Sequence, residues 1–196
     1  MITAIFTTIN KNKEQCVDLV NQKHNKTFPI LSNQCDESSF VEGDNYLIVN
    51  SNYRGVSLAR NLMLDYLPEN TDYLIFLDDD VMLVDNAKQI IVEEINKYKN
   101  VNAIYFNCVS LNKDRPIRSI KKDGKIKWRA VSSYGVWGLV IKVDAIKKYN
   151  LSFREEFGPG SKFPVGEDSI YLKELFEKVP NVYMSKQILV KIEQKE

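Results

Sequence analysis

The sequence has 196 residues, a mass of 22.7 kDa and a hydrophobic share of 44%. Such a chain can bury a sizeable core, which excludes a disordered protein, a collagen-like repeat and a disulfide-stapled miniprotein. Its 27 basic and 26 acidic side chains give a formal net charge of +1, without the basic excess of a dedicated nucleic-acid-binding protein. We therefore expect a single domain over residues 1–196 and no nucleic-acid partner.

Short apolar runs alternate with helical patterns along the first hundred residues. The pattern predicts strands over residues 2–7, 29–31, 46–49, 73–77 and 103–106. It predicts helices over residues 14–23, 56–67 and 86–98, the last with Asp85 as its N-cap. This alternation indicates an α/β fold in which helices flank a Rossmann-like, mostly parallel central sheet, and ligands bind such sheets at the carboxyl ends of the strands.

The sequence becomes basic after residue 112. Residues 113–129 hold eight basic and two acidic side chains, a local charge of +6. Within them, Asp123-Gly124 is a pair typical of type I′ turns and predicts a small antiparallel hairpin between residues 117–121 and 125–131. Beyond it we expect a strand over residues 136–143, a helix from about residue 144, a loop containing Gly158-Pro159-Gly160, a helix over residues 167–178, and short strands at residues 182 and 188.

Cysteines and apolar runs indicate the compartment. Cys16, Cys35 and Cys108 are odd in number, far apart and without a CxxC pair, so they favour reduced thiols over disulfides or a zinc site. The short apolar start has no basic region before it and predicts a first strand, not a signal peptide. No apolar run approaches the roughly 18 residues of a membrane helix. These features predict a cytoplasmic protein whose membrane contacts, if any, are peripheral.

Three consecutive carboxylates, Asp78, Asp79 and Asp80, directly follow the strand predicted over residues 73–77. Adjacent carboxylates repel one another, and a bound cation removes that cost. Side chains alternate along an extended chain, so Asp78 and Asp80 are expected to point the same way. Such a pair can hold Mg²⁺ or Mn²⁺ and leave positions for a substrate's phosphates. The alternative is a solvated acidic turn.

Two further segments carry candidate catalytic or ligand-binding residues. Glu167 and Asp168 begin the last predicted helix, where they either cap it or supply a general base that ligand binding positions. Gly55 opens the helix predicted over residues 56–67 and allows close backbone approach. Arg60, within that helix, can pair with a phosphate or form a structural ion pair with a buried carboxylate.

Taken together, these motifs resemble the family 2 glycosyltransferases, which have the GT-A fold. The resemblance rests on Ser32-Asn33-Gln34-Cys35-Asp36 after a strand, Gly-x-Ser-x-x-Arg-Asn over residues 55–61, Asp-Asp-Asp-Val over residues 78–81, and Phe-x-x-x-Phe-Gly-x-Gly over residues 153–160 before Gly-Glu-Asp over residues 166–168. These motifs cover nearly the whole chain in the family's order. The resemblance implies transfer of a sugar from a nucleotide-sugar donor to an acceptor hydroxyl, with inversion at the anomeric carbon and without a covalent intermediate.

The resemblance also implies roles for individual residues. Asp168 would be the general base, and Glu167 would orient the donor or the acceptor. Mn²⁺ or Mg²⁺ would be held by Asp80 and Asp78. The residues that would bind the donor are Thr7, Thr8, Asn10, Asn33, Gly55, Arg60, Asp78 and Asp79. Residues 1–112 would form the nucleotide-sugar-binding half of the domain and residues 113–196 the acceptor-binding half.

Two departures from the family pattern concern the donor and the metal. Many relatives have Asp-Asp-Gly-Ser where this chain has residues 33–36, so an amide takes the place of a carboxylate that reads the base. Many also have a metal- or diphosphate-binding histidine near the position of Lys191, whereas the only histidine here is His24, at the end of the first predicted helix. A UDP-sugar remains the expected donor, and metal assistance is expected despite the missing histidine.

The acceptor side is indicated by two features. Trp137, flanked by Gly135 and Gly138, can stack on a sugar ring at an acceptor site that includes Gly138, with core packing as the alternative. The basic residues 113–129 predict attraction to an anionic membrane surface or a lipid-diphosphate acceptor, with a solvated surface as the alternative. We expect a glycan, lipid-linked or protein-linked acceptor in bacterial surface-glycan or glycoconjugate synthesis.

Two other functions are compatible with parts of the sequence. A catalytically degenerate transferase that binds nucleotide or glycan as a partner of another enzyme would explain the missing histidine. An aspartate-nucleophile phosphohydrolase also has a hydrophobic strand ending in Asp-x-Asp. That motif normally lies near the N-terminus and has Thr or Val where this chain has Met82, so the transferase is the leading hypothesis.

Overall fold

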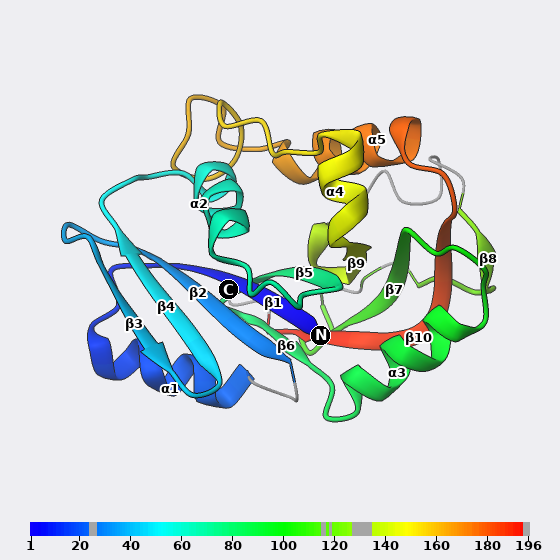
Figure 1. Ribbon diagram of the computed structural model, residues 1–196, viewed down its shortest axis with the longest axis horizontal. Helices are drawn as coiled ribbons and strands as arrows, with labels where there is room; N and C mark the ends of the chain where they lie inside the picture. The colour runs from blue at the N-terminus through cyan, green and yellow to red at the C-terminus, as the bar shows by residue number, and fades with distance from the viewer. Residues whose placement is uncertain (24–26, 115–116, 118, 127–134, 194–196) are drawn as a thin grey trace.

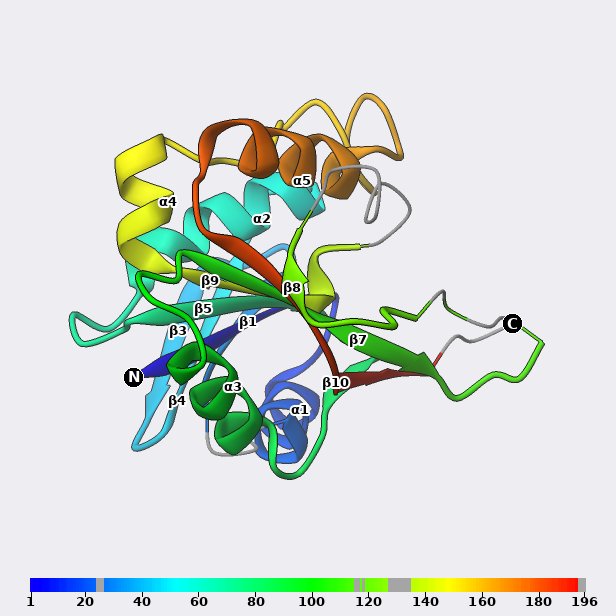
Figure 2. The same cartoon turned by 90° about the vertical axis from the view of Figure 1, so that its right-hand side faces the viewer.

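The computed structural model describes residues 1–23, 27–114, 117, 119–126 and 135–193. These residues form one central sheet with helices on both faces (Figures 1 and 2). The strands are β1 (Ile2–Ile9), β2 (Phe28–Gln34), β3 (Ser39–Gly43), β4 (Tyr46–Ser51), β5 (Tyr73–Asp78), β6 (Val81–Leu83), β7 (Ala103–Ser110), β8 (Gly124–Lys125), β9 (Leu139–Lys142) and β10 (Val182–Ile192). The helices are α1 (Lys13–Lys23), α2 (Val56–Leu62), α3 (Ala87–Asn96), α4 (Val143–Tyr149) and α5 (Glu167–Lys178), with 3-10 turns η1 (Met63–Tyr66) and η3 (Val136–Gly138).

The strand order is β3-β4-β2-β1-β5-β9-β7-β10-β6, and β8 pairs with β10. Parallel ladders join β1 to β2 and β5, β2 to β4, and β7 to β10. Antiparallel pairs join β3 to β4, β9 to both β5 and β7, and β10 to both β6 and β8. The predicted α/β fold is confirmed, although the inserted strand β9 makes the sheet more mixed than the alternation indicated. Strands β1, β2, β4, β5 and β7 still end at one common edge.

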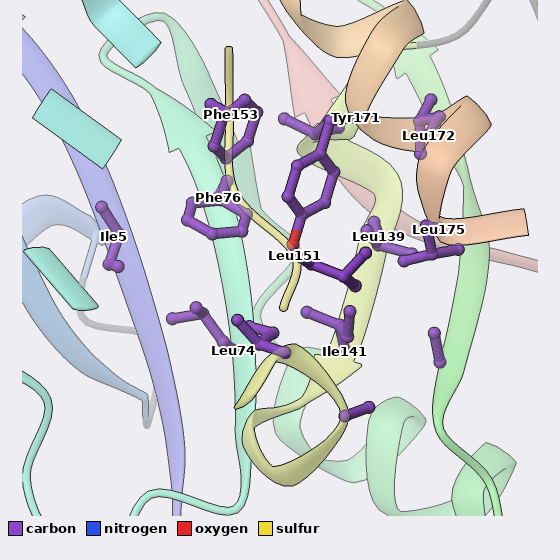
Figure 3. Packing of buried hydrophobic residues seen from close by; sticks show 14 of the residues in the cluster. Ile5, Leu74, Phe76, Leu139, Ile141, Leu151, Phe153, Tyr171, Leu172 and Leu175 are labelled. Atoms are coloured by element: carbon purple, nitrogen blue, oxygen red, sulfur yellow. The ribbon is translucent and has the colours of Figure 1, made fainter. Parts of the chain in front are cut away.

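The central strands are buried on both faces, as continuous apolar runs require. Along β5, Leu74 and Phe76 face α4 and α5, whereas Ile75 and Leu77 face the side covered by α1 and α3. On the first face, the Phe153 ring stacks on Tyr171 with centroids 4.2 Å apart and meets the Phe76 ring edge-on at 5.0 Å (Figure 3). This aromatic cluster fixes α5 above the carboxyl end of β5.

Several predicted elements differ from the structure in extent. Strands β3 and β6 were not predicted. Both are short; β3 lies at an edge of the sheet, and β6 directly follows the acidic run. The predicted helix over residues 56–67 ends at Leu62 and continues as η1, and residues 136–138 form η3 before β9. The two strands expected at residues 182 and 188 are one irregular strand, β10. Asp85 does not cap α3, whose N-cap is Asn86 without a side-chain hydrogen bond.

The predicted hairpin after residue 112 has a different partner. Gly124 and Lys125 pair antiparallel with Met184 and Tyr183 of β10, and not with the described residues of the 117–121 segment. The backbone of Ile120 is bonded instead by the Asn107 side chain, which replaces a strand partner. Residues 127–131 of the predicted hairpin lie outside the described part of the chain. Among the described residues, no helix has the length and apolar character needed to cross a membrane.

Candidate functional site

A cavity of about 300 Å³ lies at the common strand edge, where β1, β2 and β5 end beside the start of α2. It collects six of the predicted donor-binding residues together with the predicted catalytic Glu167. The lining residues are Thr7, Thr8, Ile9, Gln34, Arg54, Gly55, Val56, Arg60, Asp78, Asp79, Pro159, Gly160 and Glu167. We call this space the donor-side cavity.

The start of α2 and the Gly158-Pro159-Gly160 loop form one wall of this cavity. Gly55, with φ of 116°, adopts a backbone conformation that favours glycine, and its N–H donates to Gln34 Oε1 at 2.8 Å. The next N–H, of Val56, donates to the Pro159 carbonyl at 3.1 Å. The Val56 to Pro159 backbone hydrogen bond thereby joins two motifs about 100 residues apart in the chain.

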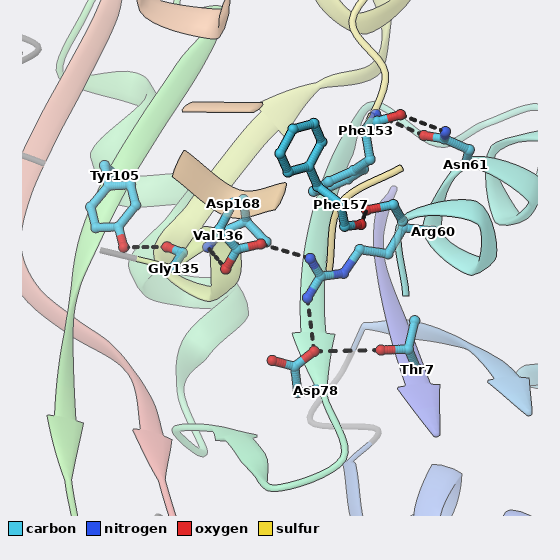
Figure 4. A network of polar contacts seen from close by, with 11 residues as sticks. Thr7, Arg60, Asn61, Asp78, Tyr105, Gly135, Val136, Phe153, Phe157 and Asp168 are labelled. Carbon is cyan, nitrogen blue, oxygen red and sulfur yellow. Dashed lines mark hydrogen bonds and ion pairs between the residues drawn. The ribbon is translucent and has the colours of Figure 1, made fainter. Parts of the chain in front are cut away.

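Arg60 is the centre of the polar network in Figure 4. Its side chain is only 2% exposed. Nη1 donates to Asp168 Oδ1 at 2.7 Å, and Nη2 donates to Asp78 Oδ1 at 2.8 Å. Burial by itself lowers the Arg60 pKa, but the charges of Asp168 and Asp78 outweigh it and raise the pKa above its ordinary value. Arg60 is therefore a fixed cation that joins the end of β5 to the start of α5.

Asp168 is held by two donors. Its Oδ1 accepts from Arg60, and its Oδ2 accepts from the Val136 N–H at 3.0 Å. Just before Val136, the Gly135 carbonyl accepts from the Tyr105 hydroxyl at 2.5 Å. The carboxylate is 20% exposed and does not line the donor-side cavity. It lies behind that cavity in a fixed orientation, between Arg60 and η3.

Glu167 is the neighbouring carboxylate that does line the cavity. Its half-buried position raises its pKa, and the negative charge of Asp168 raises it further, whereas Arg60 acts in the opposite direction. Because Arg60 pairs directly with Asp168 and not with Glu167, the two adjacent carboxylates have different electrostatic environments.

Substituting Glu167 by glutamine should raise the free energy of unfolding near neutral pH. The folded-state pKa of Glu167 lies above its unfolded value, so the stability that this group contributes is present at low pH and lost as the pH rises through the folded pKa. The gain from Glu167→Gln should be small below pH about 4 and grow above the ordinary Glu pKa of about 4.3. Urea titrations at stepped pH measure it.

The matched control for this prediction is Glu177→Gln, on the same helix. Glu177 is exposed and lies 3.9 Å from Lys173 in a surface ion pair, so this variant should show little change with pH. A gain that is equal at pH 3 and pH 7, or equal in both variants, would contradict the assignment to Glu167.

Asp78, Asp79 and Asp80, at the end of β5, each have a different hydrogen-bond partner. Asp78 accepts from Arg60 and, at 3.4 Å, from Thr7 Oγ1. Asp79 Oδ2 accepts from Thr8 Oγ1 at 2.8 Å. The Asp80 carbonyl accepts from the Glu193 N–H at 3.0 Å, which joins this turn to the end of β10. The run is thus part of the hydrogen-bonded strand edge and not a freely solvated turn.

The carboxylates at the end of β5 suit only one kind of site for a divalent cation. Within the described residues, no three His, Cys, Asp or Glu side chains converge as a metal cage would require. Mg²⁺, however, is commonly held by one or two carboxylates, with water and substrate phosphates completing the coordination. Asp78 lines the donor-side cavity and Asp80 does not, so a cation held by both carboxylates stays a prediction. His24 lies outside the described residues, and Lys191 pairs with Met82 across β10 and β6.

Asn33 and Asn10 shape the loop after β1 and do not line the donor-side cavity. The buried Asn33 amide donates to the Lys11 carbonyl at 2.9 Å and to Asn50 Oδ1 at 2.8 Å. Asn10 has φ of 53°, and its N–H donates to the Gln34 carbonyl at 3.0 Å. Gln34 is the residue of this motif that lines the cavity. Side-chain alternation along β2 is the signal that could have distinguished it from Asn33.

Trp137 and Gly138, the predicted acceptor residues, lie in η3 and do not line the donor-side cavity. The half-buried Trp137 packs against the core cluster on the α1 and α3 face, as its alternative interpretation held. A Cβ on Gly138 would lie 2.8 Å from the Phe106 carbonyl oxygen, so glycine is required there for contact with β7. Their acceptor role stays a prediction.

Comparison with solved structures identifies the architecture. The crystal structure of S. aureus TarS 1–349 in complex with UDP-GlcNAc superposes with a TM-score of 0.77 and 12% identity, covering 100% of this chain and 59% of that one. The fold is a GT-A-like glycosyltransferase fold. The UDP complex of the same fragment gives a TM-score of 0.75 and 11% identity, covering 99% of this chain and 60% of that one.

A third structure, S. aureus TarS, has a TM-score of 0.75 and 11% identity, and the match covers 98% of this chain and 36% of TarS. The chain therefore spans between about one third and three fifths of the length of these TarS chains. No protein-family model and no curated protein matches the sequence. At such low identities the likeness establishes the GT-A-like fold, and the chemistry has to be argued from the site.

Proposed function

We propose that the chain is an inverting glycosyltransferase that transfers a sugar from a UDP-sugar to an acceptor hydroxyl. The proposal is supported by the fold shared with TarS structures that contain UDP-GlcNAc and UDP. We place the reaction in bacterial surface-glycan or glycoconjugate synthesis, with a glycan, lipid-linked or protein-linked acceptor. The observation that carries the proposal is the donor-side cavity, because it brings residues of three separate motifs to one strand edge.

In this proposal the donor-side cavity binds the nucleoside diphosphate. Thr7 and Thr8 offer hydroxyls at the end of β1, and Arg60 supplies a buried positive charge. Negative charge develops on the departing diphosphate as the anomeric C–O bond breaks, and hydrogen-bond donors fixed in the cavity would stabilise it. Asp78 and Asp80 would hold Mn²⁺ or Mg²⁺, which when bound would neutralise diphosphate charge. The nucleoside would extend toward Arg54, whose Nη2 donates to Asp36 at 2.8 Å.

Asp168 is the proposed general base. It would take the proton of the acceptor hydroxyl while the acceptor oxygen forms the new bond to the anomeric carbon and the nucleoside diphosphate leaves. Each oxygen of a carboxylate has two lone pairs, so the bonds from Arg60 and Val136 leave capacity for the acceptor proton. Glu167, facing the cavity, would orient the donor or acceptor.

A donor-hydrolysis assay tests the proposal. The wild type with Mn²⁺ should release UDP from a UDP-sugar, whereas Asp80→Ala should release about a hundredfold less if it removes transition-state stabilisation of several kcal/mol. Asp85→Ala is the matched control, because Asp85 is an exposed carboxylate in the turn before α3 and is not part of the acidic run over residues 78–80. Absence of nucleotide release and of UDP binding by calorimetry would overturn the proposal.

A further inference from the structure

A second cavity, of about 430 Å³, lies at the carboxyl end of β7. Three lysines, Lys113, Lys121 and Lys186, line it together with Ile117, Ile120 and Ile188. Its described lining contains no acidic side chain, and none of the three ammonium groups forms an ion pair with another described residue. Like charges around one hollow repel one another unless an anion lies between them. We call this space the β7 cavity.

The cavity lies beside an irregular part of the β7–β10 ladder. The β7–β10 register shifts between Met184 and Ile188 and again before Val190, so β10 bulges away from β7 there. The side chain of Asn107, 7% exposed, occupies this irregular region. Its Nδ2 donates to the Lys186 carbonyl at 2.9 Å and to the Ile120 carbonyl at 3.0 Å. Bulges commonly redirect side chains beside functional sites.

Further hydrogen bonds fix the backbone that carries the lysines. Asn107 Oδ1 accepts from the Ile120 N–H at 2.6 Å, directly before Lys121. Asp123 Oδ1 accepts from the Lys186 N–H at 2.7 Å. These hydrogen bonds position the main chain at Lys186 and directly before Lys121, while the lysine side chains themselves are exposed.

The wall of the β7 cavity is connected to the Asp168 carboxylate through η3. Val136 of η3 donates its N–H to Asp168. Two residues later, Gly138 packs so closely on β7 that an added Cβ would lie 3.0 Å from Cys108 Sγ. Cys108 is itself part of the cavity lining. The η3 turn thus contacts the proposed base through Val136 and the wall of the β7 cavity through Gly138.

We propose that the β7 cavity binds a phosphate group carried by the acceptor, so that the acceptor is an anionic, phosphate-bearing molecule. The inference rests on the proposed function, because it assigns the acceptor class for the same reaction. Lysine ammonium groups bind phosphate as point charges, and the isoleucines offer apolar contact to the carbon skeleton that carries it. The cavity volume lies within the range of small-molecule sites.

Calorimetric titration with glycerol 3-phosphate tests the proposal, with UDP titrated in parallel. The double variant Lys121→Gln and Lys186→Gln should bind glycerol 3-phosphate at least about tenfold more weakly than the wild type, since charge-assisted hydrogen bonds are lost. The matched control, Lys122→Gln and Lys125→Gln, removes the same charge from neighbouring lysines that do not line the cavity. It should bind within about twofold of the wild type. Replacement of Lys121 and Lys186 by arginine should restore binding.

The outcomes separate this inference from the proposed function. Failure of the wild type to bind glycerol 3-phosphate, while UDP binds normally, would overturn the inference and leave the proposed function standing. Equal loss in the two glutamine pairs would also overturn it, because a diffuse field would then explain the attraction. Phosphate binding lost only in the Lys121 and Lys186 pair, without UDP binding, would support the cavity and count against the donor assignment.

Vesicles distinguish the source of the phosphate. Phosphatidylglycerol and phosphatidylcholine vesicles are compared for sedimentation with the two glutamine pairs. Binding to phosphatidylglycerol that is lost only in the Lys121 and Lys186 pair would support a lipid-borne phosphate in the cavity. Binding of free glycerol 3-phosphate without vesicle binding would support a soluble acceptor. Binding to vesicles alone, reduced equally by both pairs, would contradict the inference. Thermal unfolding of each variant confirms that it is folded.

Discussion

Replacing Arg60 by alanine should lower the free energy of unfolding by about 3–5 kcal/mol, because the removal of one partner leaves buried charge without compensation. Arg60 is 2% exposed and holds both Asp78 and Asp168. Arg60→Lys should recover only part of the loss, since one ammonium cannot reproduce the planar fork of the guanidinium. Urea denaturation followed by tryptophan fluorescence measures both variants.

Arg154→Ala is the control for this prediction. Arg154 is 55% exposed and pairs with Glu174 at 2.6 Å, and exposed pairs contribute about 0–1 kcal/mol. A loss in Arg60→Ala no greater than that in Arg154→Ala would show that the network is not a major source of stability. Donor hydrolysis by Arg60→Ala should also fall, because Asp78 and Asp168 lose the guanidinium that holds them in position.

Replacing Asp168 by asparagine should reduce kcat by about 10²–10⁴, the usual contribution of general acid–base catalysis. The amide has nearly the same shape as the carboxylate but cannot accept the acceptor proton. UDP affinity should remain within about twofold of the wild type, because Asp168 does not line the donor-side cavity. Initial rates with a saturating UDP-sugar, together with UDP calorimetry, separate catalysis from donor binding.

Glu167→Gln serves as the comparison for Asp168→Asn. Glu167 faces the cavity and has a raised pKa, so it is the other carboxylate that could accept a proton. A larger loss of kcat in Glu167→Gln than in Asp168→Asn would transfer the role of base to Glu167. A loss of UDP affinity matching the loss of rate in Asp168→Asn would contradict a purely catalytic role.

Local patterns predicted the buried strands well. Strands β1 and β5 are confirmed and helix α5 begins and ends at the predicted residues, whereas β2 extends beyond the predicted residues 29–31 through the polar residues Ser32, Asn33 and Gln34. Short edge elements such as β3 have too few residues to show a period. The partner of β8 depends on long-range geometry, because the Asn107 side chain bonds the segment that the turn chemistry would otherwise pair with it. No local pattern encodes that choice.

In the candidate site, too, some features could be predicted from local patterns and others depend on the assembled fold. Motif residues Gly55, Asp78 and Glu167 do meet at one cavity. Asn33 and Gln34 take opposite faces of β2, so side-chain alternation could have separated them, but only the assembled sheet shows which face meets the cavity. The simultaneous pairing of Arg60 with Asp78 and Asp168 requires α2, β5 and α5 to be assembled, so only the three-dimensional structure could reveal it.

The Arg60 to Asp168 contact also bears on the order in which the chain folds. The two residues are 108 positions apart, so the contact can form only after most of the sequence has been synthesised and the helices have packed. A high share of contacts between residues far apart in sequence slows folding. Until α5 is in place, the guanidinium of Arg60 lacks one of its two partners and the aromatic layer above β5 is open. The proposed base and the cover over β5 are therefore completed by the same helix.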